Sequence, residues 1–321
     1  MRAAIVSEYQ AAPVSGDRPP PLAVEGKALV ELRAAALNPA DLAIASGSFP
    51  AGSPPLPYVP GIEGVGIVVE SARFAPGTRV WASGRGLGVG ADGTFAEQFA
   101  ASDEILVEVP ASADDLLAAS VGVVGLAGWL PLAWLAPVRP GETVLVLGAT
   151  GNVGRVAVQA AKILGAGRVV AVGRNVDRLA RVRELGADET VELGGDDFRE
   201  RLAAAVDGVA PTLVVDALWG APLEAAAAVA GQGARIVHLG QAAGPTATIV
   251  SGLMRGKQLQ ILGYSNFAVP QDVVAQGYVD VVEHAAAGRI AVEMEAVSLE
   301  QVGEAWARQA QGSSTKLVIV S

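Results

Sequence analysis

The chain contains no cysteine, and only two of its 321 residues are histidines, His238 and His284. Disulfide bonds and metal sites built on thiolates are therefore excluded. Basic residues are also few: 23 Lys and Arg stand against 33 Asp and Glu, for a formal net charge of -10. Because a nucleic-acid-binding surface needs a basic face, we expect no nucleic-acid partner.

Long hydrophobic runs are nearly absent too. The apolar start "MRAAIV" meets Ser7 and Glu8 at once, which is too short for the apolar region of a signal peptide. Residues 116–138 carry no charge and are long enough to span a bilayer, but Pro131 and Pro137 interrupt them. We expect a buried helical hairpin there rather than a membrane helix, no membrane partner, and a cytoplasmic location.

What the chain does contain is a pattern of two domains. The first third carries short apolar or alternating runs bounded by glycine and proline, which predict β-strands, while "PVSGDRPPP" predicts an exposed turn. From about residue 143 strands alternate with helices. Strands are predicted at 143–147, 168–172, 212–216, 234–239 and 258–263, with helices over 152–164 and 176–185 between them. This alternation is typical of an α/β fold with a doubly wound parallel sheet.

A glycine-rich turn follows the first of these strands. It consists of Gly148, Ala149, Thr150, Gly151, Asn152, Val153 and Gly154. In a dinucleotide-binding turn the middle glycine lets the backbone approach a pyrophosphate and the last lets the helix pack on the strand. The helix N-terminus adds N–H groups and positive potential. The alternative is a tight strand–helix turn without a ligand, but the surrounding strand, helix and strand favour dinucleotide binding.

The second strand ends without the acidic residue that accepts hydrogen bonds from the ribose of NAD. Instead the chain has Gly173, Arg174 and Asn175, with Arg178 close behind. A guanidinium can bind phosphate in bidentate fashion, so we expect NADPH as cofactor, with Arg174 on its 2′-phosphate. The alternative is that Arg174 is a solvated charge at a strand end.

The whole chain resembles the medium-chain dehydrogenase/reductase superfamily in its zinc-free quinone oxidoreductase branch. The resemblance rests on segments that occur in the family's order, among them "AAALNPADL", "YVPGIEGVGIVVE", "DGTFAEQFA", "PGETVLVLGATGNVG", "VVDALWG", "HLGQAAG" and "TKLVIV". It implies a GroES-like catalytic domain over residues 1–116, completed by 289–321, and a Rossmann domain over 117–288. The closing strand is expected to return to the first domain.

The resemblance also indicates whether the chain is able to bind a catalytic zinc ion. Zinc-dependent relatives carry a cysteine at the position of Asn38 and a histidine at that of Ile62, and both are lost here. Glu63 remains, but one carboxylate is not a metal site. We therefore expect no metal.

By the same resemblance, three residues are candidates for the catalytic site. Asn38 either binds the substrate oxygen or the carboxamide of the cofactor, or only caps the turn before Pro39. Asp41 either orients that turn or relays a proton, or is an ordinary acid at a helix N-terminus. Tyr58 either donates to the substrate oxygen or is simply packed. Many relatives have a tyrosine where this chain has Ala43, so the substrate is not transferable.

Two further segments are expected at the nicotinamide. Leu239, Gly240 and Gln241 in "HLGQAAG" pass their backbone along it, unless they form an ordinary turn, and Tyr264 approaches it. The expected function is an NADPH-dependent, zinc-independent reductase of quinones or α,β-unsaturated carbonyls. The alternatives are a ketone/alcohol oxidoreductase and a non-catalytic NADPH-binding structural or sensor protein. The apolar strand "QLQILGY" is expected to pair with its twin in a homodimer, since a bare edge strand is a liability.

Overall fold

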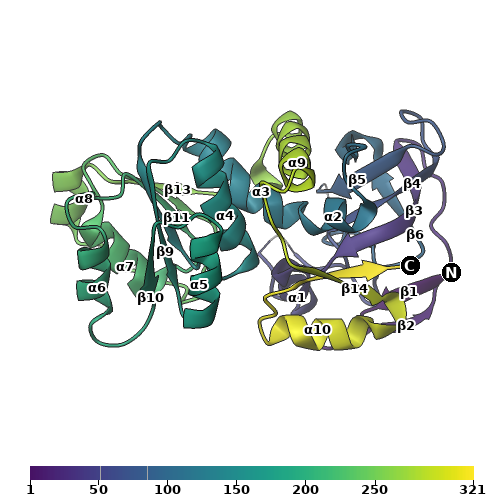
Figure 1. Cartoon of the computed structure of the whole chain (residues 1–321). Coiled ribbons are helices and arrows are strands. Elements are labelled where there is room, and N and C mark those ends of the chain that lie inside the picture. The colour runs from purple at the N-terminus through teal and green to yellow at the C-terminus, as the bar shows by residue number, and fades with distance from the viewer. Residues whose placement is uncertain (51, 85) are drawn as a thin grey trace. The chain divides into compact units, whose positions relative to one another are not determined.

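A computed structural model describes residues 1–50, 52–84 and 86–321, and it divides into two compact units. The first unit contains Met1–Val124, Val269–Gly288 and Val292–Ser321, and the second contains Gly125–Ala268 and Arg289–Ala291. Figure 1 shows the elements of each unit. The boundaries expected from the sequence, 116/117 and 288/289, differ mainly in one helix, α9 (Gln271–Ala286), which belongs to the first unit.

The second unit is built on a six-stranded parallel sheet with the strand order β10-β9-β8-β11-β12-β13. This is the strand order 3-2-1-4-5-6 of a Rossmann sheet. Its strands are β8 (Thr143–Leu147), β9 (Arg168–Gly173), β10 (Glu189–Glu192), β11 (Leu213–Asp216), β12 (Arg235–His238) and β13 (Gln260–Gly263). The central strands are apolar and buried because helices cover both faces of the sheet.

The helices of this unit follow the strands in alternation. They are α4 (Asn152–Ile163), α5 (Val176–Glu184), α6 (Phe198–Ala205), α7 (Gly220–Val229) and α8 (Ser251–Lys257). Figure 1 shows α4 and α5 on one face of the sheet and α6 and α7 on the other. The predicted doubly wound sheet is confirmed, with five of its strands and two helices within about two residues of the predicted bounds.

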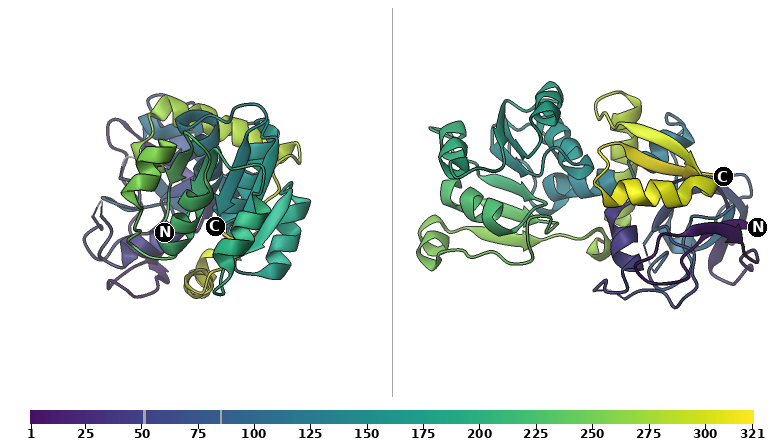
Figure 2. Two further views of the ribbon diagram at one scale, coloured as in Figure 1. Left: turned by 90° about the vertical axis from the view of Figure 1, so that its left-hand side faces the viewer. Right: turned by 90° about the horizontal axis from the view of Figure 1, so that it is seen from below.

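The first unit holds a seven-stranded sheet in the order β14-β15-β3-β4-β5-β7, with β6 paired to β3, and a two-stranded sheet β1-β2. The strands are β1 (Arg2–Ile5), β2 (Val14–Asp17), β3 (Lys27–Ala36), β4 (Glu63–Glu70), β5 (Arg79–Ser83), β6 (Gln98–Ser102), β7 (Leu106–Glu108), β14 (Met294–Ser298) and β15 (Lys316–Val320). The closing strand β15 lies between β14 and β3, so its predicted return to this domain is confirmed. Figure 2 shows both chain ends in this unit.

Two details differ from the sequence-based expectation. The segment predicted as an exposed turn contains β2, because residues 14–17 pair in register with β1. Residues 116–138 form no simple hairpin but α2 (Asp115–Ser120), α3 (Val123–Leu130) and a π-helical turn (Pro131–Leu135), because Pro131 lacks the N–H that α3 would need to continue. The remaining helices are α1 (Pro39–Ala45) and α10 (Val302–Ala310).

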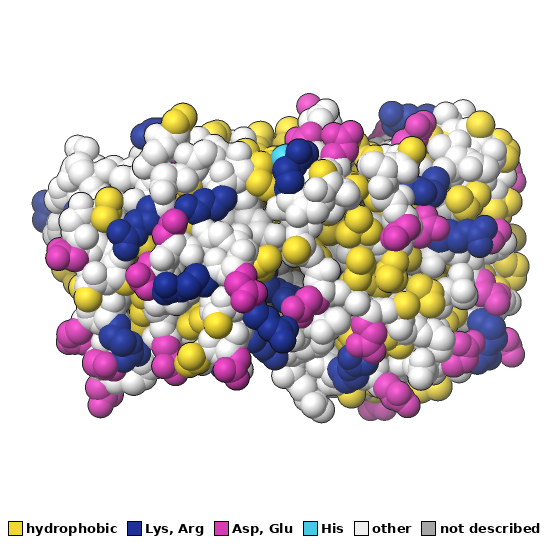
Figure 3. Space-filling model, viewed as in Figure 1, with side chains coloured by type: hydrophobic (Ala, Val, Ile, Leu, Met, Phe, Trp, Pro, Cys, Tyr) yellow, Lys and Arg dark blue, Asp and Glu magenta, His cyan; other side chains and the backbone are white. Residues whose placement is uncertain are grey.

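The surface agrees with the expectation that the chain has no basic face. On the face that Figure 3 shows, acidic and basic side chains are interspersed and no continuous basic stripe crosses it. In the described part of the chain, no helix has both the length and the apolar character needed to cross a membrane.

Candidate functional site

The glycine turn of the second unit connects β8 to α4, and its three glycines have different reasons to be there. Gly148 has a φ of +81°, and a Cβ on Gly154 would overlap the Gly148 carbonyl oxygen. The chain itself therefore requires both. Gly151 is exposed, and a Cβ there would meet nothing closer than 3.5 Å. A tight turn alone does not require Gly151, whereas the close approach of a ligand does.

The ends of four strands meet around this turn. Thr150 packs so closely on Gly173, at the end of β9, that a Cβ there would overlap it. On the other side Leu218, just after β11, lies 3.1 Å from where a Cβ of Gly148 would be. A Cβ on Gly240, after β12, would lie 2.8 Å from the Ala217 carbonyl oxygen. The strand order reverses between β8 and β11, and this switch point is where open α/β sheets bind their ligands.

The residues expected to bind the 2′-phosphate lie at the start of α5. Arg174 is exposed and Arg178 is half-buried, and neither guanidinium bonds or pairs with any residue among those described. Asn175 is the N-cap of α5, because its Oδ1 accepts from the Arg178 N–H at 2.9 Å. The helix N-terminus and two uncommitted guanidiniums fit a phosphate, although Asp177 in the same turn adds one negative charge.

The segment expected at the nicotinamide leaves β12 along the edge of the sheet. Leu239 N–H donates to the Asp216 carbonyl at 2.9 Å, and Gln241 is exposed. Tyr264 is half-buried, and its hydroxyl donates to Asn266 Oδ1 at 2.6 Å and lies 3.2 Å from the Leu126 carbonyl oxygen. Burial raises the pKa of this phenol. Its hydroxyl is thus already bonded within the second unit, and a contact with the cofactor stays a prediction.

In the first unit Asn38 lies at the centre of a buried polar cluster. Its Nδ2 donates to Glu63 Oε1 at 2.8 Å and to the Ala36 carbonyl at 3.0 Å. Its Oδ1 accepts from Lys316 Nζ at 2.6 Å. The side chain is 1% exposed, so both donors and the acceptor of the amide are used inside the chain.

Lys316 is the residue of this cluster that sequence reasoning missed. It begins β15, is 1% exposed, and also donates to the Leu37 carbonyl at 2.9 Å. Burial lowers its pKa, and the charges of Glu63 and Asp41 act against that effect. The available signal was a lysine directly preceding the apolar run "LVIV", because buried lysines occur only with polar partners.

Glu63 completes the cluster on the other side of Asn38. Its Oε2 accepts from Trp81 Nε1 at 3.1 Å and from the Val123 N–H at 2.7 Å. Burial raises its pKa, and these hydrogen bonds together with the charge of Lys316 oppose the rise. A carboxylate held by three donors serves to fix its neighbours rather than to bind a ligand.

The cluster does not fit a catalytic zinc ion. At the two positions that the sequence resemblance assigns to zinc ligands stand the amide of Asn38 and the buried apolar side chain of Ile62. The amide oxygen is already bound by the Lys316 ammonium at 2.6 Å, and a cation at that distance excludes a second one. Within the described residues no group of three or more His, Asp or Glu is placed to hold a metal ion.

Asp41 lies one turn into α1 and is also buried. Its Oδ2 accepts from the Asn38 N–H at 2.8 Å and its Oδ1 from the Ile62 N–H at 3.0 Å. These two bonds fit the predicted role of orienting the turn before Pro39 and equally that of an acid in the first turn of a helix. Burial raises the pKa of its carboxyl to about 7, so near neutral pH the group is able to hold or release a proton.

Tyr58 is 2% exposed, and its hydroxyl has no hydrogen-bond partner among the residues described. Burial raises its pKa, and the charge of Asp41 adds to the effect. The backbone here is firmly held: Tyr58 exchanges two hydrogen bonds with Val6, at 3.1 and 2.9 Å. A buried hydroxyl without a partner is costly, and its contact with a substrate oxygen stays a prediction.

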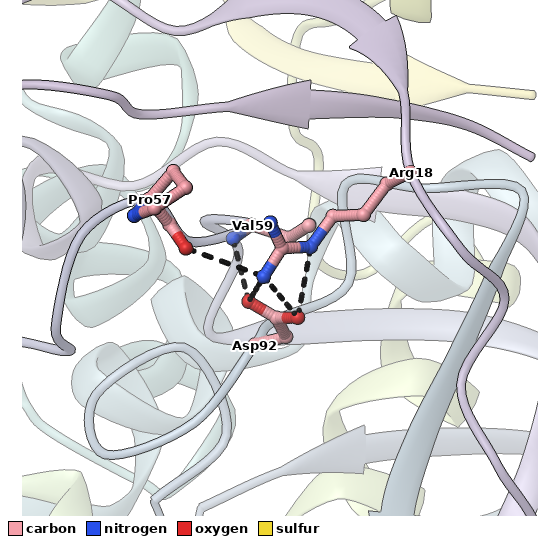
Figure 4. Close-up of polar contacts among 4 residues, drawn as sticks. All are labelled: Arg18, Pro57, Val59 and Asp92. Atoms are coloured by element: carbon pink, nitrogen blue, oxygen red, sulfur yellow. Dashed lines mark hydrogen bonds and ion pairs between the residues drawn. The ribbon is translucent and has the colours of Figure 1, made fainter.

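A clamp holds the residues on either side of Tyr58 (Figure 4). Arg18 binds both carboxylate oxygens of Asp92, at 3.0 to 3.2 Å, and also donates to the Pro57 carbonyl at 3.2 Å. Asp92 Oδ1 in turn accepts from the Val59 N–H at 2.8 Å. The phenol is therefore presented from a fixed backbone.

Comparison with known proteins places both units. Residues 24–111 match the model of the alcohol dehydrogenase GroES-like domain, and residues 152–283 match that of a zinc-binding dehydrogenase. An alcohol dehydrogenase from Rhizobium meliloti is 32% identical over 240 residues, which are 67% of this chain and 69% of that protein.

Two further similarities extend over more of the chain. A phenolphthiocerol/phthiocerol polyketide synthase polypeptide of Mycobacterium tuberculosis is 26% identical over 298 residues, 91% of this chain, and the chain spans 13% of that protein's length. The crystal structure of a mycobacterial quinone oxidoreductase superposes over the whole of both chains with a TM-score of 0.87 at 23% identity, which shows the shared fold. With its GroES-like domain and its Rossmann domain, the chain belongs to the medium-chain dehydrogenase/reductase superfamily of oxidoreductases.

Proposed function

We propose that this protein is an NADPH-dependent, zinc-independent reductase that transfers hydride to a quinone or an α,β-unsaturated carbonyl. One observation carries the proposal: the position of a zinc ligand is held by Asn38, whose amide oxygen is bonded to the Lys316 ammonium. Reduction of a simple ketone concentrates charge on one oxygen, where a metal acts as Lewis acid. A conjugated acceptor spreads that charge over an enolate or phenolate, which hydrogen-bond donors are able to stabilise.

The second unit is proposed to hold the cofactor. Residues 148–154 receive the pyrophosphate, Arg174 and Arg178 the 2′-phosphate, and the backbone of Leu239 to Gln241 the nicotinamide. The uncommitted guanidiniums and the exposed Gly151 support this assignment. When bound, the nicotinamide supplies the hydride, and the protein supplies orientation and charge stabilisation.

The first unit is proposed to hold the substrate oxygen. Tyr58 would donate its unpaired hydroxyl to that oxygen, and Asp41, with a pKa of about 7, would supply the proton. Asn38 was expected to touch the substrate or the carboxamide. Because its amide is fully engaged, we assign it as a positioning residue that fixes Asp41 through its own backbone N–H.

Absorbance of NADPH at neutral pH, followed with a panel of quinones and enones, tests the reaction. Turnover is expected with at least one conjugated acceptor and should survive exhaustive chelation. The similarity to an alcohol dehydrogenase favours a second candidate, a ketone/alcohol oxidoreductase. It would be supported if only an alcohol panel with NADP⁺ gave turnover. Binding of NADPH without turnover of either panel would indicate a non-catalytic sensor or structural protein.

We also propose a homodimer formed through the edge strand β13. All four of its residues are exposed or half-buried, and the apolar side chain of Ile261 is 37% exposed. An unpaired strand edge of this kind readily pairs with a second copy. Light scattering should give twice the chain mass for the wild type and the monomer mass for Ile261→Lys. A wild-type monomer at working concentration contradicts the proposal.

A further inference from the structure

An aspartate–histidine pair lies at the carboxyl ends of β11 and β12. Asp216 and His238 are paired in register as the last residues of these strands. Asp216 is fully buried, and its Oδ2 lies 3.3 Å from Nδ1 of His238, whose side chain is 28% exposed. The other carboxylate oxygen of Asp216, Oδ1, accepts from the Leu218 N–H at 2.9 Å and from the Trp219 N–H at 3.0 Å.

The turn that Asp216 holds is strained. Trp219 has φ 60° and ψ -165°, a conformation that is essentially restricted to glycine. The Trp219 ring lies on the His238 ring, with centroids 4.1 Å apart and planes at 42°. Such strain persists only where the surroundings fix it, and it clusters at ligand sites. Here the surroundings are the carboxylate on one side and the imidazole on the other.

The position of the pair relative to the cofactor rests on the proposed function. With the pyrophosphate at residues 148–154 and the 2′-phosphate at Arg174 beyond β9, the other half of the dinucleotide would run over the ends of β11 and β12, because these strands lie on the other side of β8. The segments that follow these two strands are joined there, since Ala243 N–H donates to the Leu218 carbonyl at 2.8 Å. On the proposed function, the pair would thus lie in the nicotinamide half of the cofactor site.

We propose that the Asp216–His238 pair discriminates the oxidised from the reduced cofactor by its charge. With a neutral imidazole the pair carries one negative charge, and with an imidazolium it carries none. The nicotinamide ring is positive in NADP⁺ and neutral in NADPH. The pair therefore favours NADP⁺ at high pH and loses this preference on acidification, because histidine is the side chain that changes charge between about pH 5 and 8.

No second ionisable group among the described contacts competes for His238. Asp216 faces its imidazole from β11 and the Trp219 ring from the turn before α7, while the Tyr264 N–H donates only to the His238 backbone carbonyl at 2.8 Å. Burial raises the pKa of Asp216, while hydrogen bonds from the Trp219 and Leu218 N–H groups and from His238 act to keep it charged. The 2′-phosphate of the cofactor titrates in this range too, but equally in both forms, so it cancels in their affinity ratio.

Calorimetric titration with NADP⁺ and NADPH at pH 6 and pH 8.5 tests the inference without turnover. For the wild type, the Kd of NADP⁺ relative to that of NADPH should rise about three- to tenfold on going to pH 6, because the pair loses its negative charge. His238→Gln keeps a donor for Asp216 but does not titrate, so its ratio should not change with pH. His284→Gln, at the only other histidine of the chain, should keep the wild-type dependence.

A second variant separates the effect of the Asp216 charge on binding from an effect on folding. Asp216→Asn keeps an acceptor for the turn and should weaken NADP⁺ at pH 8.5 by the same three- to tenfold, with NADPH unchanged and thermal unfolding as the check on folding. A ratio that is independent of pH in the wild type, or equally dependent in His238→Gln, overturns the inference while the proposed function stands. If neither cofactor binds, the proposed function fails and the inference with it.

Discussion

The polar groups of the buried cluster around Asn38 have partners within the chain, whereas those at the start of α5, here called the cofactor edge of the Rossmann sheet, do not. In the cluster the Asn38 amide, the Glu63 carboxylate and the Lys316 ammonium are buried and bonded to one another or to the backbone. At the cofactor edge Arg174 and Arg178 have no partner among the residues described. Groups that satisfy one another stabilise the fold, whereas groups left open are available to a ligand.

The largest expected effect tests the closed cluster. Lys316→Met removes the cation of the cluster and leaves two buried carboxyl groups without it. The free energy of unfolding should fall by about 3–5 kcal/mol, as when one member of a buried ion pair is removed. Urea denaturation measures this. The double variant Lys316→Met/Glu63→Gln should lose less free energy of unfolding than Lys316→Met alone. Equal losses in the two variants would show that the two charges are not coupled.

Tyr58 differs from the residues of the Asn38 cluster, because its buried hydroxyl has no hydrogen-bond partner among the residues described. Tyr58→Phe should lower kcat by about 10²- to 10³-fold, which is typical for the loss of one donor to a developing oxyanion. Stability should stay the same or rise by about 1 kcal/mol, since an unpaired buried hydroxyl is removed. Steady-state kinetics together with thermal unfolding measure both. A stable variant with unchanged kcat would make Tyr58 a packing residue.

The cofactor edge should respond in binding rather than in stability. Arg174→Ala should weaken NADPH about ten- to a hundredfold, for the loss of a charge-assisted hydrogen bond, and leave NADH nearly unchanged. Arg178→Ala should act in the same direction but less. Fluorescence titration with both cofactors measures this. Arg183→Ala, on the same helix but paired with Glu189, is the control. Equal weakening of NADH would mean that Arg174 is a structural charge.

The remaining expected effect concerns pH. The pKa of Asp41 is raised from 3.8 to about 7 in the folded chain, so the folded state retains a proton that the unfolded state has released. This contribution to stability is present below about pH 4 and is lost as pH rises towards 7, with a slope of up to about 1.4 kcal/mol per pH unit. Asp41→Asn should remove that slope, measured as the difference from wild type in urea titrations. Parallel curves would contradict a raised pKa.

The sequence indicated the Rossmann unit well because its signals are local. Apolar runs, C-terminal glycines and the turn at Gly148 all lie within a few residues of the feature that they predict. β10 was missed because its sequence, ETVE, is polar on an edge strand. The cluster around Asn38 was predicted only in part, because Lys316 reaches it from 278 residues away. No local pattern reports such a contact, and the same holds for the pairing of β2 with β1.

The place of β15 between β14 and β3 also decides when the first unit is able to form. During synthesis the second unit emerges almost as one continuous stretch, and its strands find partners close by in the chain. The seven-stranded sheet must wait, because its third strand precedes its second by nearly the whole chain: Lys316 meets Leu37 across 279 residues. Until then residues 34–36 of β3 lack the strand that pairs with them, and the carboxyl groups of Asp41 and Glu63 lack their cation. During synthesis the second unit is therefore able to fold before the buried cluster around Asn38 is complete.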